Sequence, residues 1–486
     1  MKRTIKLIAD GAEQILEART GELLPAVLKR YKVPLDLPCG GKGTCKGCPI
    51  LIDGKMCEAC QTKVLADMQV ELHADGNVQN IAEGDIAQTP PVNPMFEAYG
   101  IAVDIGTTTI CAALLDRAGR GDTVTRKNPQ AAFGADVISR IEHALEGEAP
   151  ALAASIRTAL SEMISELCAK RGIDSGLVDA LVVTGNTAML YLLTGQNPKA
   201  LSHAPFLADR LFGEFIGAGE WGLPISQNAR VYLPRCISAF VGGDISCAVL
   251  ASGMCAEGAT TLLVDIGTNG EIALWNGTSL ICCSTAAGPA LEGAGITHGS
   301  YGVSGAIDRV WQEAGAVKCA TIGGKPAIGI CGSGIVDAVA VMLETEIIEE
   351  TGAFAGDADV LPLKDGVDIT AADVRKVQLA KGSVRAGIET LLETEGLAHA
   401  DIGTLYIAGG FGSFLNLDSA AKIGLIPAGM SERTKVIGNA AHTGAVMLLA
   451  DENLIASTVQ LVEGARTVSL DANPVFTDNY MEYMMF

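Results

Sequence analysis

The chain of 486 residues is longer than one ordinary domain, so we expect at least two folded units. Apolar residues make up 49% and charged residues only 19%, which excludes a disordered chain and predicts large packed cores. The formal net charge of −21 argues against nucleic acid or a membrane surface as a partner, because both attract a basic face. With neither a signal-peptide pattern nor an apolar run long enough for a membrane helix, we expect a cytoplasmic protein.

The first 72 residues predict a small unit of strands and one helix. Residues 3–8 and 13–18 are typical of two short strands that flank the turn dipeptide Asp10–Gly11. Residues 22–31 follow with helical spacing, and a further strand is expected around Val70–Leu72. Strand, strand, helix, loop and strand is the element order of a β-grasp fold.

Five of the fourteen cysteines are crowded into one glycine-rich stretch of this unit. Cys39, Cys45, Cys48 and Cys60 have the spacing C-x5-C-x2-C-x11-C, and four thiolates suit an iron–sulfur cluster or zinc. Two close pairs that include Cys57 could also hold zinc, but that arrangement would leave Cys39 out. Glycines in such a loop expose backbone N–H groups to cluster sulfides, which favours iron. We expect the other nine cysteines to be small buried residues.

The sequence PCGGKGTCKGC, followed by ACQTKV, resembles the cluster loop of plant-type and adrenodoxin-type [2Fe–2S] ferredoxins. In that pattern the fourth ligand lies in an A-C-Q context, so the resemblance implies that Cys60 is a ligand and Cys57 is spare. The spacing before Cys60 is shorter than in most such ferredoxins, which leaves the choice between Cys57 and Cys60 open. We expect an α+β, β-grasp [2Fe–2S] ferredoxin domain at residues 1–87 and a Pro-rich linker at residues 88–98.

Three strand-and-glycine motifs recur further along the chain. They are IAVDIGTTT at 101–109, LVDIGTNGE at 263–271 and LYIAGGFGS at 405–413. The first two are near-copies in which a buried strand ends in Asp and a Gly–Thr turn follows, so they predict an internal duplication. Such a hairpin offers backbone N–H groups and hydroxyls to phosphate oxygens, and its Asp can hold Mg²⁺ directly or through water. Two hairpins that face each other across a cleft would hold a triphosphate from both sides.

The three motifs in this order resemble those of the acetate kinase, sugar kinase, Hsp70 and actin (ASKHA) superfamily. The resemblance implies an α/β actin-like, RNase H-like ATPase domain with two duplicated lobes at residues 99–486. Asp104 and Asp265 would position Mg²⁺ and the attacking water, and Asp244 is either a water-orienting carboxylate or a helix N-cap. The residues expected to contact ATP are Gly106, Thr107, Thr108, Thr109, Gly267, Thr268, Asn269, Gly270, Gly409, Gly410, Phe411 and Gly412. The sequence contains neither a Walker A motif nor a dinucleotide fingerprint.

Further motifs narrow the resemblance to one family. They are NPQ at 128–130, FGADVISRI at 133–141, TGNTAM at 184–189, FVGGD at 240–244, ICGSGIVD at 330–337 and GNAA at 438–441. Together with the N-terminal cysteines, they are similar to the reductive activators of corrinoid-dependent methyltransferases. The resemblance implies an anaerobic enzyme that uses ATP to drive one electron from the [2Fe–2S] cluster to the Co(II) corrinoid of a partner protein. A low-potential donor such as ferredoxin or flavodoxin would reduce the cluster, and a homodimer is common in such relatives.

Residues 293–305 contain five glycines, which predicts a mobile loop that could approach the corrinoid, with His298 or Ser300 on the cobalt side. Two other functions stay open at this point. One is a small-molecule kinase with a redox-sensing ferredoxin domain. The other is a redox-gated binding protein that uses ATP only to clamp a partner.

Overall fold

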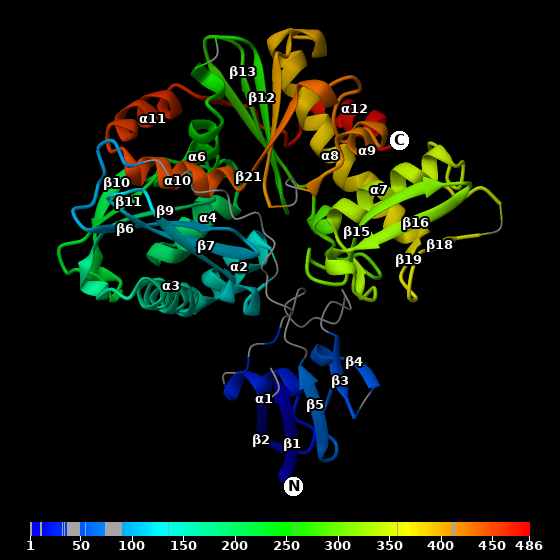
Figure 1. Cartoon of the computed structure of the whole chain (residues 1–486), viewed down its shortest axis with the longest axis horizontal. Helices are drawn as coiled ribbons and strands as arrows, with labels where there is room; N and C mark the ends of the chain where they lie inside the picture. The colour runs from blue at the N-terminus through cyan, green and yellow to red at the C-terminus, as the bar shows by residue number, and fades with distance from the viewer. Residues whose placement is uncertain are drawn as a thin grey trace.

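The computed structural model describes residues 2–9, 12–31, 33, 35, 49–53, 55–72, 90–134, 136–256, 258–356, 358–410 and 414–486. Figure 1 shows a small N-terminal unit below two larger lobes that lie side by side. We call these lobe I and lobe II, and each is defined by the central sheet described below.

The N-terminal unit is a mixed five-stranded sheet with one helix packed against it. The strand order is β2-β1-β5-β3-β4, with β1 antiparallel to β2 and parallel to β5. The elements are β1 (Lys2–Ala9), β2 (Ala12–Arg19), α1 (Leu24–Arg30), β3 (Pro49–Ile52), β4 (Lys55–Glu58) and β5 (Met68–Leu72). Ile5, Leu16, Leu28 and Val70 meet in its core, because alternate strand residues and one helix face are apolar. The β-grasp prediction is confirmed, and the β3–β4 hairpin is an element that the sequence did not predict.

The chain packs against lobe I before the first strand of that lobe begins. The backbone N–H of Met95 donates to the carbonyl of Leu449 at 3.0 Å, and Phe96 is 1% exposed. A Cβ on Gly100 would lie 2.5 Å from the Phe96 ring, so only glycine leaves room for this packing. We therefore propose that lobe I begins near Met95, within the expected linker of residues 88–98.

Lobe I is built on a six-stranded sheet in the order β10-β11-β9-β6-β7-β8. Its strands are β6 (Tyr99–Ile105), β7 (Thr109–Asp116), β8 (Gly121–Lys127), β9 (Val178–Gly185), β10 (Glu214–Gly217) and β11 (Arg230–Leu233). Its helices are α2 (Val137–His143), α3 (Ala149–Arg171), α4 (Thr187–Thr194), α5 (Lys199–Ser202) and α10 (Ala440–Ala450). Helices α3 and α4 pack on one face and α10 on the other, because successive strand residues such as Ala102 and Val103 point to opposite faces.

Lobe II is built on a second six-stranded sheet, in the order β21-β20-β12-β13-β14-β22. Its strands are β12 (Thr261–Ile266), β13 (Gly270–Trp275), β14 (Leu280–Thr285), β20 (Thr404–Ala408), β21 (Thr434–Gly438) and β22 (Arg466–Thr467). A sheet of β15 (Ala306–Glu313), β16 (Ala316–Thr321) and β17 (Gly329–Ile330) and a hairpin of β18 (Val360–Pro362) and β19 (Asp368–Thr370) extend it. The remaining helices are α6 (Gly243–Ser252), α7 (Gly332–Glu344), α8 (Ala371–Glu395), α9 (Leu417–Lys422), α11 (Asn453–Glu463) and α12 (Pro474–Tyr483).

The two central sheets share a core of five strands and differ in the sixth, which is β10 in lobe I and β22 in lobe II. In lobe I, β6, β7 and β8 form an antiparallel meander and β9 pairs parallel to β6. In lobe II, β12, β13 and β14 repeat the meander and β20 pairs parallel to β12. Helix α6 joins the lobes, because Cys247 packs in the core beneath the lobe I sheet and Ile245 in the core beneath the lobe II sheet. An internal duplication would give this arrangement.

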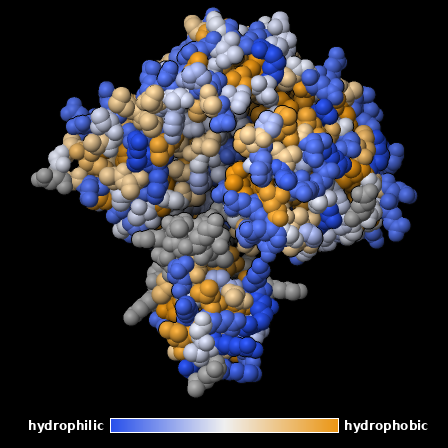
Figure 2. Space-filling view, turned by 180° about the vertical axis from the view of Figure 1, so that it is seen from behind, coloured by the Kyte–Doolittle hydropathy of each residue, from blue (hydrophilic) through white to orange (hydrophobic). Residues whose placement is uncertain are grey.

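The surface is mixed in character. Seen from behind, hydrophilic residues are interspersed with apolar patches over both lobes and the N-terminal unit (Figure 2). Of the helices that the structure describes, none combines the length and the apolar character needed to cross a bilayer. The nine cysteines outside the N-terminal unit are buried, apart from the half-buried Cys255 and Cys319, as the sequence predicted.

Candidate active site

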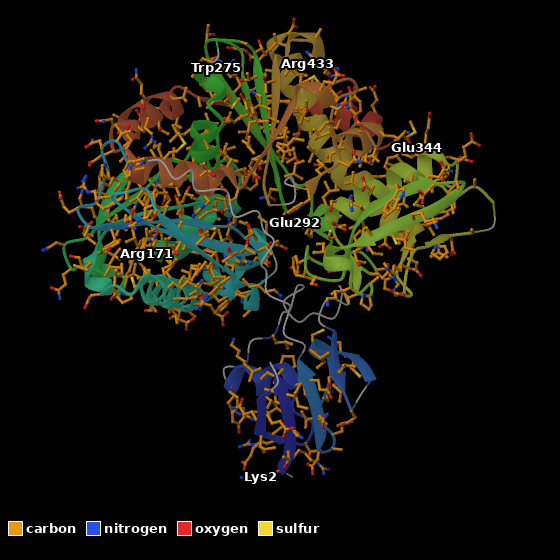
Figure 3. The ribbon with its side chains drawn as sticks, viewed as in Figure 1. Lys2, Arg171, Trp275, Glu292, Glu344 and Arg433 are labelled. Carbon is orange, nitrogen blue, oxygen red and sulfur yellow. The ribbon has the colours of Figure 1, made fainter. Side chains whose placement is uncertain are left out.

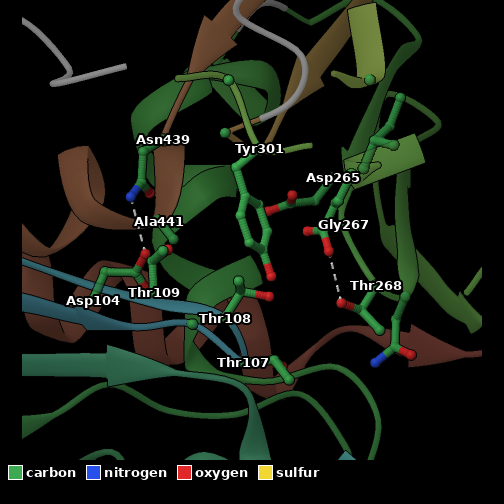
Figure 4. Close-up of a pocket in the computed structure, with 18 of the residues that line it drawn as sticks. Asp104, Thr107, Thr108, Thr109, Asp265, Gly267, Thr268, Tyr301, Asn439 and Ala441 are labelled. Atoms are coloured by element: carbon green, nitrogen blue, oxygen red, sulfur yellow. Dashed lines mark hydrogen bonds between the residues drawn. The ribbon is translucent and has the colours of Figure 1, made fainter. Parts of the chain in front are cut away.

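A cleft between the lobes brings together both predicted hairpins and the third motif. Figure 4 looks into this cleft, with Thr107 and Thr108 on one side and Thr268 on the other. The three predicted carboxylates, Asp104, Asp244 and Asp265, all line it. So do Gly106, Thr107, Thr108, Thr109, Gly267, Thr268, Asn269, Gly409 and Gly410. Phe411 and Gly412 lie outside the described residues.

The first hairpin turns tightly between β6 and β7. The backbone N–H of Gly106 donates to the carbonyl of Thr109 at 2.9 Å, and a Cβ on Gly106 would lie 2.9 Å from that same oxygen. The buried side chain of Asn128 donates to the Gly106 carbonyl at 2.8 Å, and the buried Arg140 donates to the Thr107 carbonyl at 2.7 Å. These bonds occupy carbonyl groups of the turn, so its N–H and hydroxyl groups can serve an anion in the cleft.

The second hairpin turns between β12 and β13 over a loop of the same length, but its closing hydrogen bond reaches a carbonyl two residues on instead of three. The N–H of Gly267 donates to the carbonyl of Asn269 at 3.0 Å, and the hydroxyl of Thr268 donates to Glu292 Oε2 at 3.0 Å. Gly270 does not line the cleft. A Cβ there would lie 3.0 Å from side-chain atoms of Thr285 and Val384, so this glycine permits close packing behind the hairpin.

The third motif brings a strand end close to the second hairpin. Gly409 follows β20 with φ +97°, a conformation that favours glycine. A Cβ at this position would lie 2.5 Å from the Ile266 carbonyl oxygen and 2.7 Å from Asp265 Oδ1. The backbone at Gly409 can therefore approach the carboxylate only because it carries no side chain.

Four helices begin at the rim of the cleft. Asn186 and Asn439 are the N-caps of α4 and α10, Asp244 is in the first turn of α6, and Ser333 is in the first turn of α7. The N-terminus of a helix carries partial positive charge and N–H groups without intrahelical partners. Convergence of these ends makes the cleft suitable for a phosphate-bearing ligand.

Five carboxylates line the cleft, and each has a raised pKa. Burial raises the pKa of Asp104 to about 6, although a hydrogen bond of 3.0 Å from Asn439 Nδ2 opposes this. Burial, and then the charges of Asp104 and Glu292, raise the pKa of Asp265 to about 7. Burial and mutual repulsion oppose the ionisation of these neighbouring carboxyl groups. Such a group of acids is typical of a site where a bound cation neutralises the charge.

The pKa of Asp244 is raised further than that of Asp104 or Asp265. Burial, and then the charges of Asp265 and Asp104, raise its pKa to about 8. Gly242 is the N-cap of α6, whereas Asp244 lies in the first turn and its Oδ1 accepts a bond of 2.8 Å from the N–H of Ile245. The N-cap alternative for Asp244 is therefore wrong, and its carboxyl group faces the cleft.

The cleft contains functional groups that sequence reasoning missed. Glu292 lies where the two lobes meet (Figure 3), and burial raises its pKa. Glu271 has a pKa well above its usual range because of burial and then the charge of Asp244. Lys127, at the end of β8, and Tyr301 complete the lining from opposite lobes. Asn439 belongs to the GNAA motif, which the sequence singled out without giving it a role.

Asp104 and Asp265 are the two carboxylates that we expect to position Mg²⁺. Among the residues that the structure describes, no three His, Cys, Asp or Glu side chains are grouped closely enough to hold a metal ion. This is compatible with Mg²⁺, which is usually held by one or two carboxylates while phosphates and water complete its octahedral shell.

The cysteines predicted to hold a cluster are only partly described. Cys39, Cys45 and Cys48 lie outside the described residues. Cys60 is buried in the 3₁₀ turn Ala59–Gln61, and Cys57 is half-buried on β4. The side-chain amide of Gln61 donates to Cys60 Sγ at 3.7 Å.

The glycine-rich loop at 293–305 is folded back on itself. A Cβ on Gly299 would lie 1.8 Å from the Gly293 carbonyl oxygen, and the N–H of Ser300 donates to the carbonyl of Ile330 at 2.9 Å. His298 Nδ1 lies 3.0 Å from Asp368 Oδ1 on β19. Of this loop, it is Tyr301, Gly302 and Val303 that reach the cleft, whereas His298 and Ser300 do not line it.

Two lobes that share a five-stranded sheet core, with paired hairpins and helix N-termini around an acidic cleft, define an ATPase of the ASKHA superfamily. Comparison with known families agrees. A family profile described as the C-terminal domain of RACo, the ASKHA domain, matches residues 259–486, and one described as the RACo middle region matches residues 99–257.

Relatives extend the match over the whole chain. The chain is 30% identical to the corrinoid activation enzyme RamQ of Eubacterium limosum, over 98% of each protein. It is 26% identical to a Co(II) methylated amine-specific corrinoid protein reductase of Methanosarcina barkeri, over 75% of this chain and 72% of that one. A solved structure titled reductive activator for corrinoid,iron-sulfur protein is 27% identical with a TM-score of 0.74, over 99% of this chain and 98% of that one. The chain belongs to the family of reductive activators of corrinoid proteins.

Proposed function

We propose that this protein is an ATP-dependent reductive activator that passes one electron to the Co(II) corrinoid of a partner protein and so restores Co(I). The observation that carries the proposal is the presence, in one chain, of an acidic two-lobed nucleotide cleft and a β-grasp unit with clustered cysteines. The names of the relatives point to the same activity.

The cleft supplies what ATP hydrolysis needs. We assign phosphate binding to the N–H and hydroxyl groups of the two hairpins and to the helix N-termini around them. Asp104 and Asp265 fit as Mg²⁺-positioning carboxylates, because their mutual repulsion would be relieved by a cation. Asp244, with a pKa of about 8, can hold the attacking water and accept its proton.

The N-terminal unit fits an iron–sulfur cluster by its donor set. Cys60 is buried in the core of the unit, and the Gln61 amide donates a hydrogen bond to its sulfur, as amide groups do to the sulfur atoms that hold clusters. We assign Cys39, Cys45, Cys48 and Cys60 as ligands of a [2Fe–2S] cluster in residues 1–87. When bound, the cluster carries one electron at a time, supplied by a low-potential ferredoxin or flavodoxin.

Coupling between the two units would come from the nucleotide. A ligand shifts a conformational equilibrium only by its different affinity for the two states. ATP that contacts both hairpins favours closed lobes, and ADP with free phosphate favours them less. Closure of the lobes would tighten the grip of the protein on the corrinoid partner. A tighter grip would in turn make the Co(II) of that partner easier to reduce.

The test is anaerobic and optical. The cluster is reduced, a Co(II) corrinoid protein is added, and the Co(I) absorption band is followed with and without Mg-ATP. ATP-dependent Co(I) formation, lost in Cys60→Ser and kept in the matched variant Cys57→Ser, supports the proposal. A reducible cluster that forms no Co(I) with any corrinoid partner would refute it and favour the kinase or the redox-gated binding protein.

A further inference from the structure

The lining of the cleft is strongly unbalanced in charge. Asp104, Asp244, Asp265, Glu271 and Glu292 line it, whereas Lys127 is the one cationic residue among the described residues that do. A triphosphate that enters this cleft meets five acidic groups, so its charge must be offset by Mg²⁺ and by any cation that the protein supplies.

Lys127 is placed beside the first hairpin. It is the last residue of β8 and pairs in register with Thr109, which closes the hairpin on β7. The next residue, Asn128, is buried, and its side chain donates to the Gly106 carbonyl at 2.8 Å. The backbone that carries Lys127 is therefore fixed relative to the turn that offers N–H groups to phosphate.

The ammonium group of Lys127 meets an aromatic ring from the other lobe. Its Nζ lies 5.3 Å from the centre of the Tyr301 ring, within the range of a cation–π contact. Tyr301 projects from lobe II into the space between the two hairpins, with Thr108 on one side of it and Thr268 on the other (Figure 4). The contact therefore bridges the lobes at the place where phosphates would lie.

The backbone at Tyr301 is tied to lobe II. The N–H of Ser300 donates to the carbonyl of Ile330 at 2.9 Å, directly before the start of α7, and the N–H of Val303 donates to the carbonyl of Tyr301 at 2.8 Å. These bonds hold the backbone that carries Tyr301 against the segment that precedes α7.

We propose that Lys127 is the protein's cationic contact to the terminal phosphate of ATP, and that the Tyr301 ring competes with this phosphate for the ammonium group. This rests on the ATP-binding part of the proposed function. A phosphate forms a charge-assisted hydrogen bond with an ammonium group, which is a stronger partner than a ring face. ATP therefore replaces a ring contact between the lobes with phosphate contacts to both hairpins, whereas ADP, which lacks the terminal phosphate, leaves the ring contact in place.

The test compares binding of ADP with that of a non-hydrolysable ATP analogue, both with Mg²⁺, by calorimetry on the full chain. Lys127→Met should weaken binding of the triphosphate by about tenfold or more and binding of ADP by less than about twofold. Lys170→Met removes a lysine from the exposed side of α3, where it pairs with Glu166, and should leave both affinities unchanged. Equal loss for the two nucleotides, or no loss for the triphosphate, overturns the assignment of Lys127.

A second pair of variants tests the competition. Tyr301→Leu removes the ring face and should tighten binding of the triphosphate several-fold relative to binding of ADP. Tyr301→Phe keeps the ring face and should retain the wild-type ratio of the two affinities. Weaker triphosphate binding in Tyr301→Leu, or the same ratio in both variants, overturns the competition. A wild-type chain that binds neither nucleotide would refute nucleotide binding itself, which distinguishes failure of the proposed function from failure of this inference.

Discussion

The two lobes share a five-stranded sheet core but present different chemistry to the cleft. Lobe I supplies the ammonium group of Lys127 and a single carboxylate, Asp104, whereas lobe II supplies the three carboxylates Asp265, Glu271 and Glu292. The fifth carboxylate, Asp244, lies on α6, the helix that joins the lobes. Equivalent aspartates therefore have different surroundings. Asp104 accepts a hydrogen bond from an amide and has a pKa of about 6, whereas Asp265 faces further acidic groups and has a pKa of about 7.

The two hairpins are therefore alike in strand pairing and loop length but differ in the charged and polar groups around them. Both turns close through a glycine N–H, but Thr107 of lobe I accepts from the Asn186 amide, and Thr268 of lobe II donates to Glu292. We infer that lobe I mainly holds phosphate and that lobe II mainly holds the cation.

The largest expected effect is that of Asp265→Asn. If Asp265 positions Mg²⁺ as we propose, its loss should lower the rate of ATP hydrolysis by about a hundredfold or more, because charge stabilisation in a dry site is a large part of such catalysis. Phosphate release measured under saturating Mg-ATP checks this. Asp359→Asn, an exposed aspartate of the same lobe, is the matched control and should hydrolyse ATP at the wild-type rate. A rate in Asp265→Asn within threefold of wild type would contradict the assignment of the cation to lobe II.

The next effect is steric and concerns the approach of the third motif to Asp265. Gly409→Ala places a methyl group against the Ile266 carbonyl and the Asp265 carboxylate, and should cost about 2–4 kcal/mol of unfolding free energy. Gly277→Ala shares the backbone strain, with φ +94° against +97°, but its Cβ has no neighbour within 4 Å, so it should cost about 1 kcal/mol. Denaturant unfolding of both variants separates the cost of the steric contact at Gly409 from the cost of backbone strain. Equal losses of unfolding free energy would show that the contact does not affect stability.

A smaller effect follows from the raised carboxylate pKa values. Asp104, with a pKa of about 6, and Asp265, with a pKa of about 7, bind protons more tightly in the folded than in the unfolded chain. Their contribution to stability is therefore greatest at acidic pH and is lost as the pH rises through these values.

Because Mg²⁺ binds the ionised form, it should raise the melting temperature more at about pH 8 than at about pH 5. Thermal unfolding with and without MgCl₂ at both pH values measures this, and Asp265→Asn should lose most of the difference. A Mg²⁺ effect that is the same at both pH values would argue against an ionisation-dependent site.

The smallest effect concerns the amide that distinguishes Asp104. Asn439→Ser keeps a side-chain oxygen able to cap α10 but removes the Nδ2–H that donates to Asp104. The pKa of Asp104 should then rise further, so the acid limb of the pH profile for ATP hydrolysis should move to higher pH, with little change in melting temperature. An unchanged acid limb would show that Asn439 serves only as a cap.

The sequence predicted the strands, turns and helix that are encoded by short stretches of neighbouring residues. The strand, Asp and Gly–Thr order places Asp104 and Asp265 correctly, because a buried strand that ends in a tight turn is encoded within nine residues. The first two strands, the helix and the last strand of the N-terminal unit are confirmed for the same reason.

Features that depend on distant parts of the chain could not be predicted. Glu292 reaches Thr268 only because the β13–β14 hairpin returns the chain to the cleft. Lys127 and Tyr301 come from different lobes, and nothing in their local sequence indicates that they meet. Gly270 belongs to a motif that predicts phosphate contact, yet packing against Val384 of α8 decides its position.

The most direct experiment asks whether the nucleotide cleft is needed for electron transfer to the corrinoid. Wild type and Asp265→Asn are loaded to the same cluster content, reduced to the same extent and mixed with a Co(II) corrinoid protein and Mg-ATP, while the Co(I) band is followed. We predict Co(I) in the wild type only with Mg-ATP, and none in Asp265→Asn despite an identical cluster spectrum. Co(I) formation at the wild-type rate in Asp265→Asn would contradict the claim that the lobe II site drives the electron transfer.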